Sequence, residues 1–385
     1  MLIVEQYSSL FSLYLYGLLV LPAVVLCLLG RKSKWMNCVI STAMIVLLLG
    51  PLSLQMWEFA LFLAGEGILL LFFRFFRRRS SSELVYYLVF ALSMLPLLFV
   101  KAAGKTAYGS VIGFVGVSYV SFKVWELLIL IHDGKTERMS MMNMALFLLF
   151  GPPFSSGPIC RFEAFTAESE KPLPREEYLG EYLVPGIKKL ILGVFYKFSL
   201  AFLLSEYVLS RYENVSVKGA IAYLYAYTLF LFFDFAGYSL MAVGTGYLLG
   251  IKMPDNFNRP FLARSIKEFW ERWHISLSTW FNELLFSRFV LNNVRNGLFR
   301  SPKTAARWAY LVTMLTMGLW HGFYWHYIIY GLYHGVLLIL TDIWLKSKVY
   351  RKVKKLRGYA WGSRFVCFHL IALGMLLFSG FLLPN

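Results

Sequence analysis

Charged residues are scarce in this chain, and their scarcity excludes an ordinary soluble domain. Only 15% of the 385 residues are Asp, Glu, Lys or Arg, whereas a soluble domain has about a quarter. Hydrophobic residues make up 58% of the chain, and the mean hydropathy is +0.61. The 35 Phe, 24 Tyr and 11 Trp residues are more than one core needs, so we expect many of them to face lipid. The composition predicts an integral membrane protein.

Cysteine is also scarce, and its four positions show no pairing pattern. Cys27, Cys38 and Cys367 lie in apolar runs, where free cysteine packs as a small hydrophobic residue. Cys160 lies in a loop without an evident partner, so we predict neither a disulfide nor a metal site. Several common catalytic patterns are missing as well: G-x-S-x-G, H-E-x-x-H, Walker A, and G-x-G-x-x-G before a helix.

Acidic residues are outnumbered, with 21 Asp and Glu against 38 Lys and Arg, which gives a net charge of +17. The basic residues gather in short loops between apolar runs, and the loop 346–364 contains no acidic residue. This is the positive-inside pattern, so membrane topology explains most of the charge and a nucleic-acid partner is not predicted. Placing the basic loops in the cytoplasm puts both termini outside.

Apolar runs long enough to cross a bilayer, about 20 residues each, recur along the chain. The N-terminus has no basic n-region and no small-residue cleavage site, so its first run is expected to be a retained span. With two shorter runs, 139–154 and 305–320, we expect about ten or eleven crossings. The clear candidate spans are 10–29, 35–54, 56–76, 84–100, 107–131, 190–209, 218–250, 324–345 and 365–383.

Residues 155–189 form the longest polar stretch before the C-terminal half. We expect a surface loop there, with one short amphipathic helix. No repeat of 20–50 residues and no low-complexity segment divides the chain. We therefore expect a single membrane-embedded domain over residues 1–385.

Ionisable residues at membrane depth are costly and indicate function by default. They are also frequent structural contacts between helices, and sequence alone leaves that reading open. The residues that meet this criterion are Asp234, His274, His321, His326, His334, His369, Lys123 and Glu126.

His274 lies in a segment, 259–291, that is too charged to span a membrane yet rich in Trp and Phe. At 100° per residue the apolar side chains from residue 266 onward gather on one face of a helix. Lys267, Glu271, His274 and Ser278 gather on another. Such a helix either lies on the membrane surface or dips inward with its polar face lining a cavity.

His321 lies between Gly318 and Gly322, at the apex of an expected hairpin over residues 308–345. The glycines permit close backbone approach or a helix break. A neutral imidazole there can take a proton from a hydroxyl group. These features leave a transporter and an enzyme equally open.

At these segments the sequence resembles the membrane-bound O-acyltransferase family. The matching stretches run in the family's order between residues 119 and 335, the part of the chain expected to carry the catalytic core. They are Ser156–Arg161, Phe233–Tyr238, Asn256–Phe261, Ser265–Trp270, Trp273–Trp280 and Gly318–Gly322.

The resemblance implies an all-α polytopic membrane protein whose helices form a ring around a central tunnel. It implies His321 as the catalytic base and His274 as a second catalytic residue that polarises the carbonyl group. The substrate-tunnel or carrier-docking residues that it suggests are Ser278, Trp273, Asn256, Arg295, Arg300 and Lys303.

Within the family the chain is most similar to members that transfer D-alanine to teichoic acid in the Gram-positive cell wall. That likeness implies a small acidic carrier protein with a 4'-phosphopantetheine arm, other membrane proteins of the D-alanylation system, and no cofactor held by the chain itself. An O-acetyltransferase for an exported polysaccharide is the alternative within the family. A transporter with a His/Asp proton relay is the alternative outside it. The immediate acceptor (polymer, lipid intermediate or helper protein) stays open.

Overall fold

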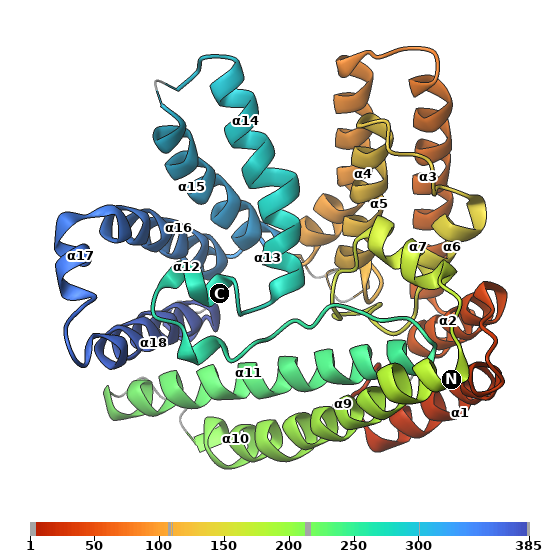
Figure 1. Ribbon diagram of the computed structural model, residues 1–385, viewed down its shortest axis with the longest axis horizontal. Coiled ribbons are helices and arrows are strands. Elements are labelled where there is room, and N and C mark those ends of the chain that lie inside the picture. The colour runs from red at the N-terminus through yellow and green to blue at the C-terminus, as the bar shows by residue number, and fades with distance from the viewer. Residues whose placement is uncertain (1–4, 107–108, 110, 212–216, 300, 383–385) are drawn as a thin grey trace. The chain divides into compact units, whose positions relative to one another are not determined.

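The computed structural model describes residues 5–106, 109, 111–211, 217–299 and 301–382, and within these ranges it contains helices and no β-strand (Figure 1). The fold class that the resemblance implies, an all-α polytopic membrane protein, is confirmed. The contacts divide the chain into two compact units. The first comprises residues 1–194 and 238–254, and the second comprises residues 195–237 and 255–385. The prediction of one domain stays a prediction.

The first unit contains most of the long N-terminal helices and a cluster of shorter ones. Helix α5 packs on α3 and α4, and α6 packs on α2 and α5. The helices of this unit are α1 Leu10–Leu28, α2 Lys34–Leu49, α3 Leu54–Arg77, α4 Glu83–Ala103, α5 Val117–His132, α6 Met141–Leu149, α7 Phe162–Glu170, α8 Arg175–Glu177, the π-helical η1 Tyr178–Leu183 and α9 Val184–Phe195.

The second unit contains the C-terminal helices, and α15 and α16 form its most extensive contact. Helix α11, Val217–Leu248, contributes its first part to this unit and its last part to the first unit. The other helices are η2 Tyr196–Ala201, α10 Phe202–Tyr207, η3 Leu209–Arg211, η4 Pro260–Leu262, α12 Ile266–Trp270, α13 Ile275–Phe281, η5 Asn282–Phe286, α14 Ser287–Arg295, α15 Pro302–His321, α16 Trp325–Lys346, α17 Lys348–Val353 and α18 Tyr359–Phe378.

Six helices among the described residues are long and apolar enough to cross a membrane: α1, α3, α4, α11, α16 and α18. They support a multi-pass membrane protein. The other clear candidates correspond to α2, α5 and the π-interrupted helices α9–α10, which are shorter or broken. The run 305–320 is the apolar part of α15. The run 139–154 gives only the nine residues of α6, about 14 Å of helix, which is too short to cross. The count of ten or eleven crossings stays a prediction.

The segment 155–189 is mostly helical, so the predicted loop is wrong, whereas the short amphipathic helix expected within it is present as α7. Helix α7 follows residues 157–160, which are buried. The buried Glu126 carboxylate accepts hydrogen bonds from the Phe162 backbone at 2.7 Å and from the Arg161 guanidinium at 3.1 Å. The charged residues that suggested exposure sit on one side of α7, and the aromatic residues between them pack inward.

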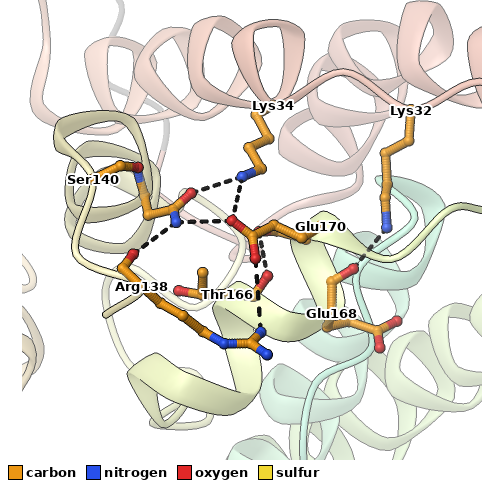
Figure 2. Close-up of polar contacts among 9 residues, drawn as sticks. Lys32, Lys34, Arg138, Ser140, Thr166, Glu168 and Glu170 are labelled. Carbon is orange, nitrogen blue, oxygen red and sulfur yellow. Dashed lines mark hydrogen bonds and ion pairs between the residues drawn. The ribbon is translucent and has the colours of Figure 1, made fainter. Parts of the chain in front are cut away.

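Those charged residues hold α7 against the loop that joins α1 to α2, as Figure 2 shows. Lys32 donates to the Glu168 carbonyl at 2.7 Å, and Lys34 pairs with Glu170 at 2.9 Å. Asn143, on α6, donates to the same Glu170 carboxylate at 3.0 Å. The hydrogen bonds from Lys34 and Asn143 lower the pKa of Glu170. The cluster therefore ties three segments of the first unit together at one point.

The N-terminal segment is fixed by Gln6, which is 6% exposed. Its amide nitrogen donates to the Gly151 and Pro152 carbonyls at 2.8 and 3.0 Å. Its amide oxygen accepts from the Tyr238 hydroxyl at 2.8 Å and from the Ser155 backbone at 3.1 Å. A single side chain thus joins the start of the chain to the segment after α6 and to α11.

The hairpin of α15 and α16 depends on two glycines that let the backbones touch. A Cβ atom on Gly318 would lie 2.3 Å from the Tyr327 carbonyl oxygen, and one on Gly331 would lie 2.5 Å from the Met314 carbonyl oxygen. Real Cβ atoms do not approach backbone oxygen this closely, so any larger residue must push the helices apart. The expected close approach at Gly318 is present, and α15 runs unbroken to His321.

We expect Gly331→Ala to lower the stability of the protein. The added methyl group forces the backbones of α15 and α16 apart, and overpacking of this kind costs about 1–3 kcal/mol. The thermal unfolding midpoint of the purified protein in detergent should fall. Gly65→Ala, on α3, is the matched control because its Cβ would meet nothing within 4 Å. An equal midpoint for the two variants would show that the close contact is not required.

Candidate functional site

His274 occupies a break between two short helices, so the continuous helix predicted over this segment is wrong. Helix α12 ends at Trp270, α13 begins at Ile275, and His274 adopts a left-handed backbone with φ 45° and ψ 52°. This conformation is uncommon for residues other than glycine, and it persists only where the surroundings impose it.

Residues 256–258 impose the break by pairing with it. Phe257 and Trp273 form an isolated antiparallel bridge. The Asn258 backbone donates to the Arg272 carbonyl, and the Ile275 backbone donates to the Asn256 carbonyl, both at 2.9 Å. The Asn256 side-chain oxygen also accepts from the Ser276 hydroxyl at 2.6 Å. Asn256 therefore shapes the backbone that presents His274, and its predicted place in the tunnel or the docking surface stays a prediction.

The His274 ring is buried, with 5% of its surface exposed. It packs edge-to-face on Phe235 at 4.7 Å between ring centroids. Its Nδ1 atom has no hydrogen-bond partner among the described residues. Burial lowers the pKa of His274 to about 3, because desolvation penalises the charged imidazolium. The ring is therefore neutral at physiological pH.

Trp273 and Ser278 flank His274 but face different surroundings. Trp273 is 5% exposed and stacks on Phe269 at 5.4 Å, so it belongs to the aromatic packing under the break. The Ser278 hydroxyl donates to the Trp273 carbonyl at 3.3 Å. Ser278 lines a cavity, whereas Trp273 does not line it.

His321 is the last residue of α15, where the hairpin turns into α16 through Gly322, as the sequence predicted. Its ring is partly exposed and lies against Trp320 and Phe378, with centroids 4.6 and 4.8 Å away. Tyr327 closes a third side at 5.6 Å. Aromatic side chains thus surround an imidazole that keeps some accessible surface.

A cavity of about 420 Å³ lies between neighbours of the two histidines. Ile275 and Ser278 come from the segment after His274, and Met317 comes from the last turn of α15 before His321. The histidine rings themselves are not among its lining residues, so their sharing of one cavity stays a prediction. Lys267 and Glu271 line the cavity as well.

Two polar atoms in the cavity wall lack partners among the described residues: the Trp270 Nε1–H and the Thr313 hydroxyl. Both side chains are 8% exposed. A buried donor without a partner costs about 1–3 kcal/mol, so the wall is suited to a ligand that carries polar groups. The site predictions did not include either residue: Trp270 lies in the family-like stretch 265–270 but was assigned no role, and a Thr in an apolar segment carries no signal in one sequence.

The remaining candidate residues are exposed cations at the end of α14 and the start of α15, histidines of α16 and α18, and ionisable residues that contact neighbouring helices. Arg295, at the end of α14, and Lys303, in the first turn of α15, are exposed; Arg300 lies outside the described residues. His326 and His334 are buried in α16, at 5% and 0% exposure. The His369 Nδ1 lies 2.8 Å from the Phe365 carbonyl one turn earlier in α18. Asp234 forms an ion pair with Lys197, and the Lys123 Nζ donates to the Leu148 carbonyl at 3.4 Å. In both pairs the ionisable group contacts a neighbouring helix, as structural residues do.

Comparison with known proteins identifies the family. The model of the membrane-bound O-acyltransferase family matches residues 83–382. The chain belongs to this family. It is therefore an acyltransferase, and the transporter alternative loses its support.

Among individual members of the membrane-bound O-acyltransferase family, the chain is 35% identical to a teichoic acid D-alanyltransferase of Streptococcus thermophilus, covering 98% of this chain and 95% of the relative. It is 33% identical to the protein of the same name in Bacillus subtilis, covering 97% and 98%. A "probable alginate O-acetylase" of Pseudomonas aeruginosa is 32% identical, over 59% of this chain and 42% of the relative.

The burial of His274 predicts a pH dependence of stability. In the unfolded chain its pKa returns to near 6.5, whereas in the fold it is about 3. Between these values the unfolded chain binds a proton that the folded protein does not. The free energy of unfolding contributed by this residue should therefore fall by about 1.4 kcal/mol per pH unit as the pH drops below 6.5.

The measurement compares thermal unfolding midpoints of the wild type and His274→Gln in detergent from pH 8 to pH 4. The difference between the two unfolding midpoints should be constant above about pH 7. Below that pH the midpoint of the wild type should fall more than that of His274→Gln. A difference that stays constant down to pH 4 would contradict a neutral, desolvated His274.

Proposed function

We propose that this chain transfers D-alanine from a carrier-protein thioester in the cytoplasm to hydroxyl groups of teichoic acid, as a multi-pass protein of the cell membrane with both termini outside. The supporting observation is the likeness to teichoic acid D-alanyltransferases along nearly the whole length of both chains. The alginate O-acetylase likeness covers less than half of that relative, so an O-acetyltransferase is the weaker candidate.

The transfer is an acyl exchange between a thioester and a hydroxyl group. The acceptor oxygen attacks the carbonyl carbon, the carbon–sulfur bond breaks, and the thiol leaves on the carrier. The acceptor loses its proton to a base, and we assign that role to His321. A positioned base contributes typically about 10²–10⁴-fold to the rate. The alignment of two bound reactants supplies much of the rest.

His274 suits a different role from His321. A neutral imidazole can donate one hydrogen bond, and the buried position of His274 makes such a bond stronger than it would be in water. We assign it to the oxygen of the thioester carbonyl, where negative charge develops during the attack. Asn256 supports this role by holding the left-handed turn that orients the ring.

The 420 Å³ cavity fits the 4'-phosphopantetheine arm of the carrier. The arm contains two amide groups, and the Trp270 Nε1–H and the Thr313 hydroxyl are buried donors that lack partners among the described residues. Met314 and Met317 supply apolar wall around them. When bound, the arm supplies the activated acyl group, and the wall residues orient it.

The docking surface for the carrier is proposed at the end of α14 and the start of α15. Arg295 and Lys303 are exposed there, and Leu291 and Leu298 expose 64% and 70% of their surfaces beside them. Exposed positive charge attracts an acidic protein from a distance, and exposed leucine side chains provide area to bury on contact. Other membrane proteins of the D-alanylation system are further proposed partners.

Replacing His321 with Ala should reduce D-alanine transfer by roughly 10² or more, the usual worth of a positioned base. The variant should reach the membrane and still bind the loaded carrier, because one partly exposed side chain is lost from the hairpin apex. Transfer of labelled D-alanine in proteoliposomes measures the effect. His369→Ala is the control, since that ring bonds within its own helix. Near-normal transfer by a folded His321→Ala protein would refute the assignment.

Reversing the charges at Arg295 and Lys303 to Glu should weaken binding of an acidic carrier by tenfold or more at low salt. Salt screens exposed charges within about 8 Å at physiological ionic strength, so the difference from wild type should shrink as salt is added. Binding is measured by titrating labelled carrier onto the purified protein. Lys352→Glu with Lys355→Glu reverses the same number of charges at the end of α17 and just after it. A loss confined to that control pair would place the docking surface elsewhere.

A further inference from the structure

A second cavity, of about 590 Å³, lies in the second unit among the segment before α12, α17 and the start of α18. Five of its lining side chains are cationic and one is acidic: Arg259, Arg264, Arg272, Lys354, Arg364 and Glu268. The acidic residue is already matched, because Glu268 pairs with Arg272 at 2.7 Å and accepts from the Arg264 backbone at 2.7 Å. Excess positive charge therefore converges on this cavity.

The other four cations have no acidic partner among the described residues. Arg364 donates to the Leu262 carbonyl at 3.2 Å, and Lys354 lies 5.5 Å from the centre of the Tyr350 ring. Arg259 and Arg264 line the cavity and are exposed. Four like charges facing one space repel each other, and an anion placed among them removes that repulsion. Guanidinium groups favour phosphate, which they bind with two parallel hydrogen bonds.

The cationic cavity continues into an apolar groove of about 380 Å³ between α16 and α18. Arg264, Ser265 and Tyr359 line both spaces. Beyond them the groove is walled by apolar side chains of α18, Val366 and Leu370, and by Trp344 of α16. Both helices are candidate membrane spans, so the groove lies between two helices that are expected to be in lipid.

We propose that this cavity and groove together bind one anionic phospholipid. The phosphate of the headgroup lies among Arg259, Arg264, Arg364 and Lys354, and one acyl chain lies in the groove between α16 and α18. Basic pockets between membrane helices on the cytoplasmic side are suited to such headgroups, and the positive-inside pattern predicts the loop 346–364 on that side. The proposal does not depend on the transfer reaction.

A soluble anion would use the cationic cavity but not the groove. An acidic protein would use exposed charge but would not need a narrow apolar groove that joins a cationic cavity between two membrane helices. The continuity of the two spaces therefore favours a molecule with a charged head and an apolar tail. Trp361 and Phe365 lie in the first turns of α18 and expose 75% and 66% of their surfaces. Exposed aromatic side chains of this kind are typical of the membrane–water interface.

Two variants separate the two parts of the site. Arg264→Gln with Arg364→Gln removes charge from the cavity, and Gly362→Phe fills the groove, because a Cβ on Gly362 meets nothing within 4 Å. Lys348→Gln with Arg351→Gln removes equal charge from exposed positions of α17 that do not line the cavity. The full-length protein is purified in detergent, and its binding of phosphatidylglycerol, phosphatidylcholine and inorganic phosphate is measured by native mass spectrometry and thermal shift.

The wild type should retain phosphatidylglycerol in preference to phosphatidylcholine. The arginine variant should lose tenfold or more of its affinity for phosphatidylglycerol, since each basic residue near the headgroup contributes measurably. Gly362→Phe should weaken lipid binding and leave phosphate binding unchanged, and the α17 control should match the wild type. Equal retention of the two lipids, or an arginine variant that matches its control, overturns the proposal. If Gly362→Phe leaves lipid binding unchanged, the groove holds no acyl chain, and only the phosphate part of the proposal stands.

Discussion

A backbone group buried away from water needs a hydrogen-bond partner within the protein, so a helix that stops among packed side chains must be met there by another segment. The break around His274 meets this requirement through residues 256–258, which take up the backbone groups that the two short helices leave over. The left-handed turn exists because this pairing exists. The orientation of the His274 ring, its burial against Phe235 and its neutral state all depend on that pairing.

The hairpin that carries His321 depends on the small volume of two glycines rather than on hydrogen bonds. Gly318 and Gly331 let the two helices touch through their backbones, so the apex residue is held by close packing of main chain. Aromatic side chains then fill the space around the imidazole. His274 is thus held by its left-handed backbone, and His321 is held by the close contact between α15 and α16. Both arrangements restrict the orientation of the imidazole ring.

Much of the fold was predictable because hydropathy acts locally. The first span, predicted at 10–29, is Leu10–Leu28, and the hairpin apex falls at His321. The last span was predicted to start at residue 365, yet α18 begins at Tyr359, because the helix continues through polar residues that a hydropathy count rejects.

Other features depend on distant residues and were beyond one sequence. The break at His274 is imposed by a segment about 17 residues away, while the local pattern of residues 266–280 fits one continuous helix. The polar stretch 155–189 was mistaken for a loop because the charges that suggested one lie on the outer side of helices, where some of them bond to α6 and to the start of α2. The cavity donors Trp270 and Thr313 become visible only when two helices are placed side by side.

The bonds of Gln6 carry a consequence for how the protein is made. The Gln6 side-chain amide accepts a hydrogen bond from the hydroxyl of Tyr238, which is 232 residues later in the chain. A ribosome adds about 5–20 residues per second, so roughly 10 to 50 seconds of synthesis separate the two groups. Maturation of the first unit is therefore paced by translation.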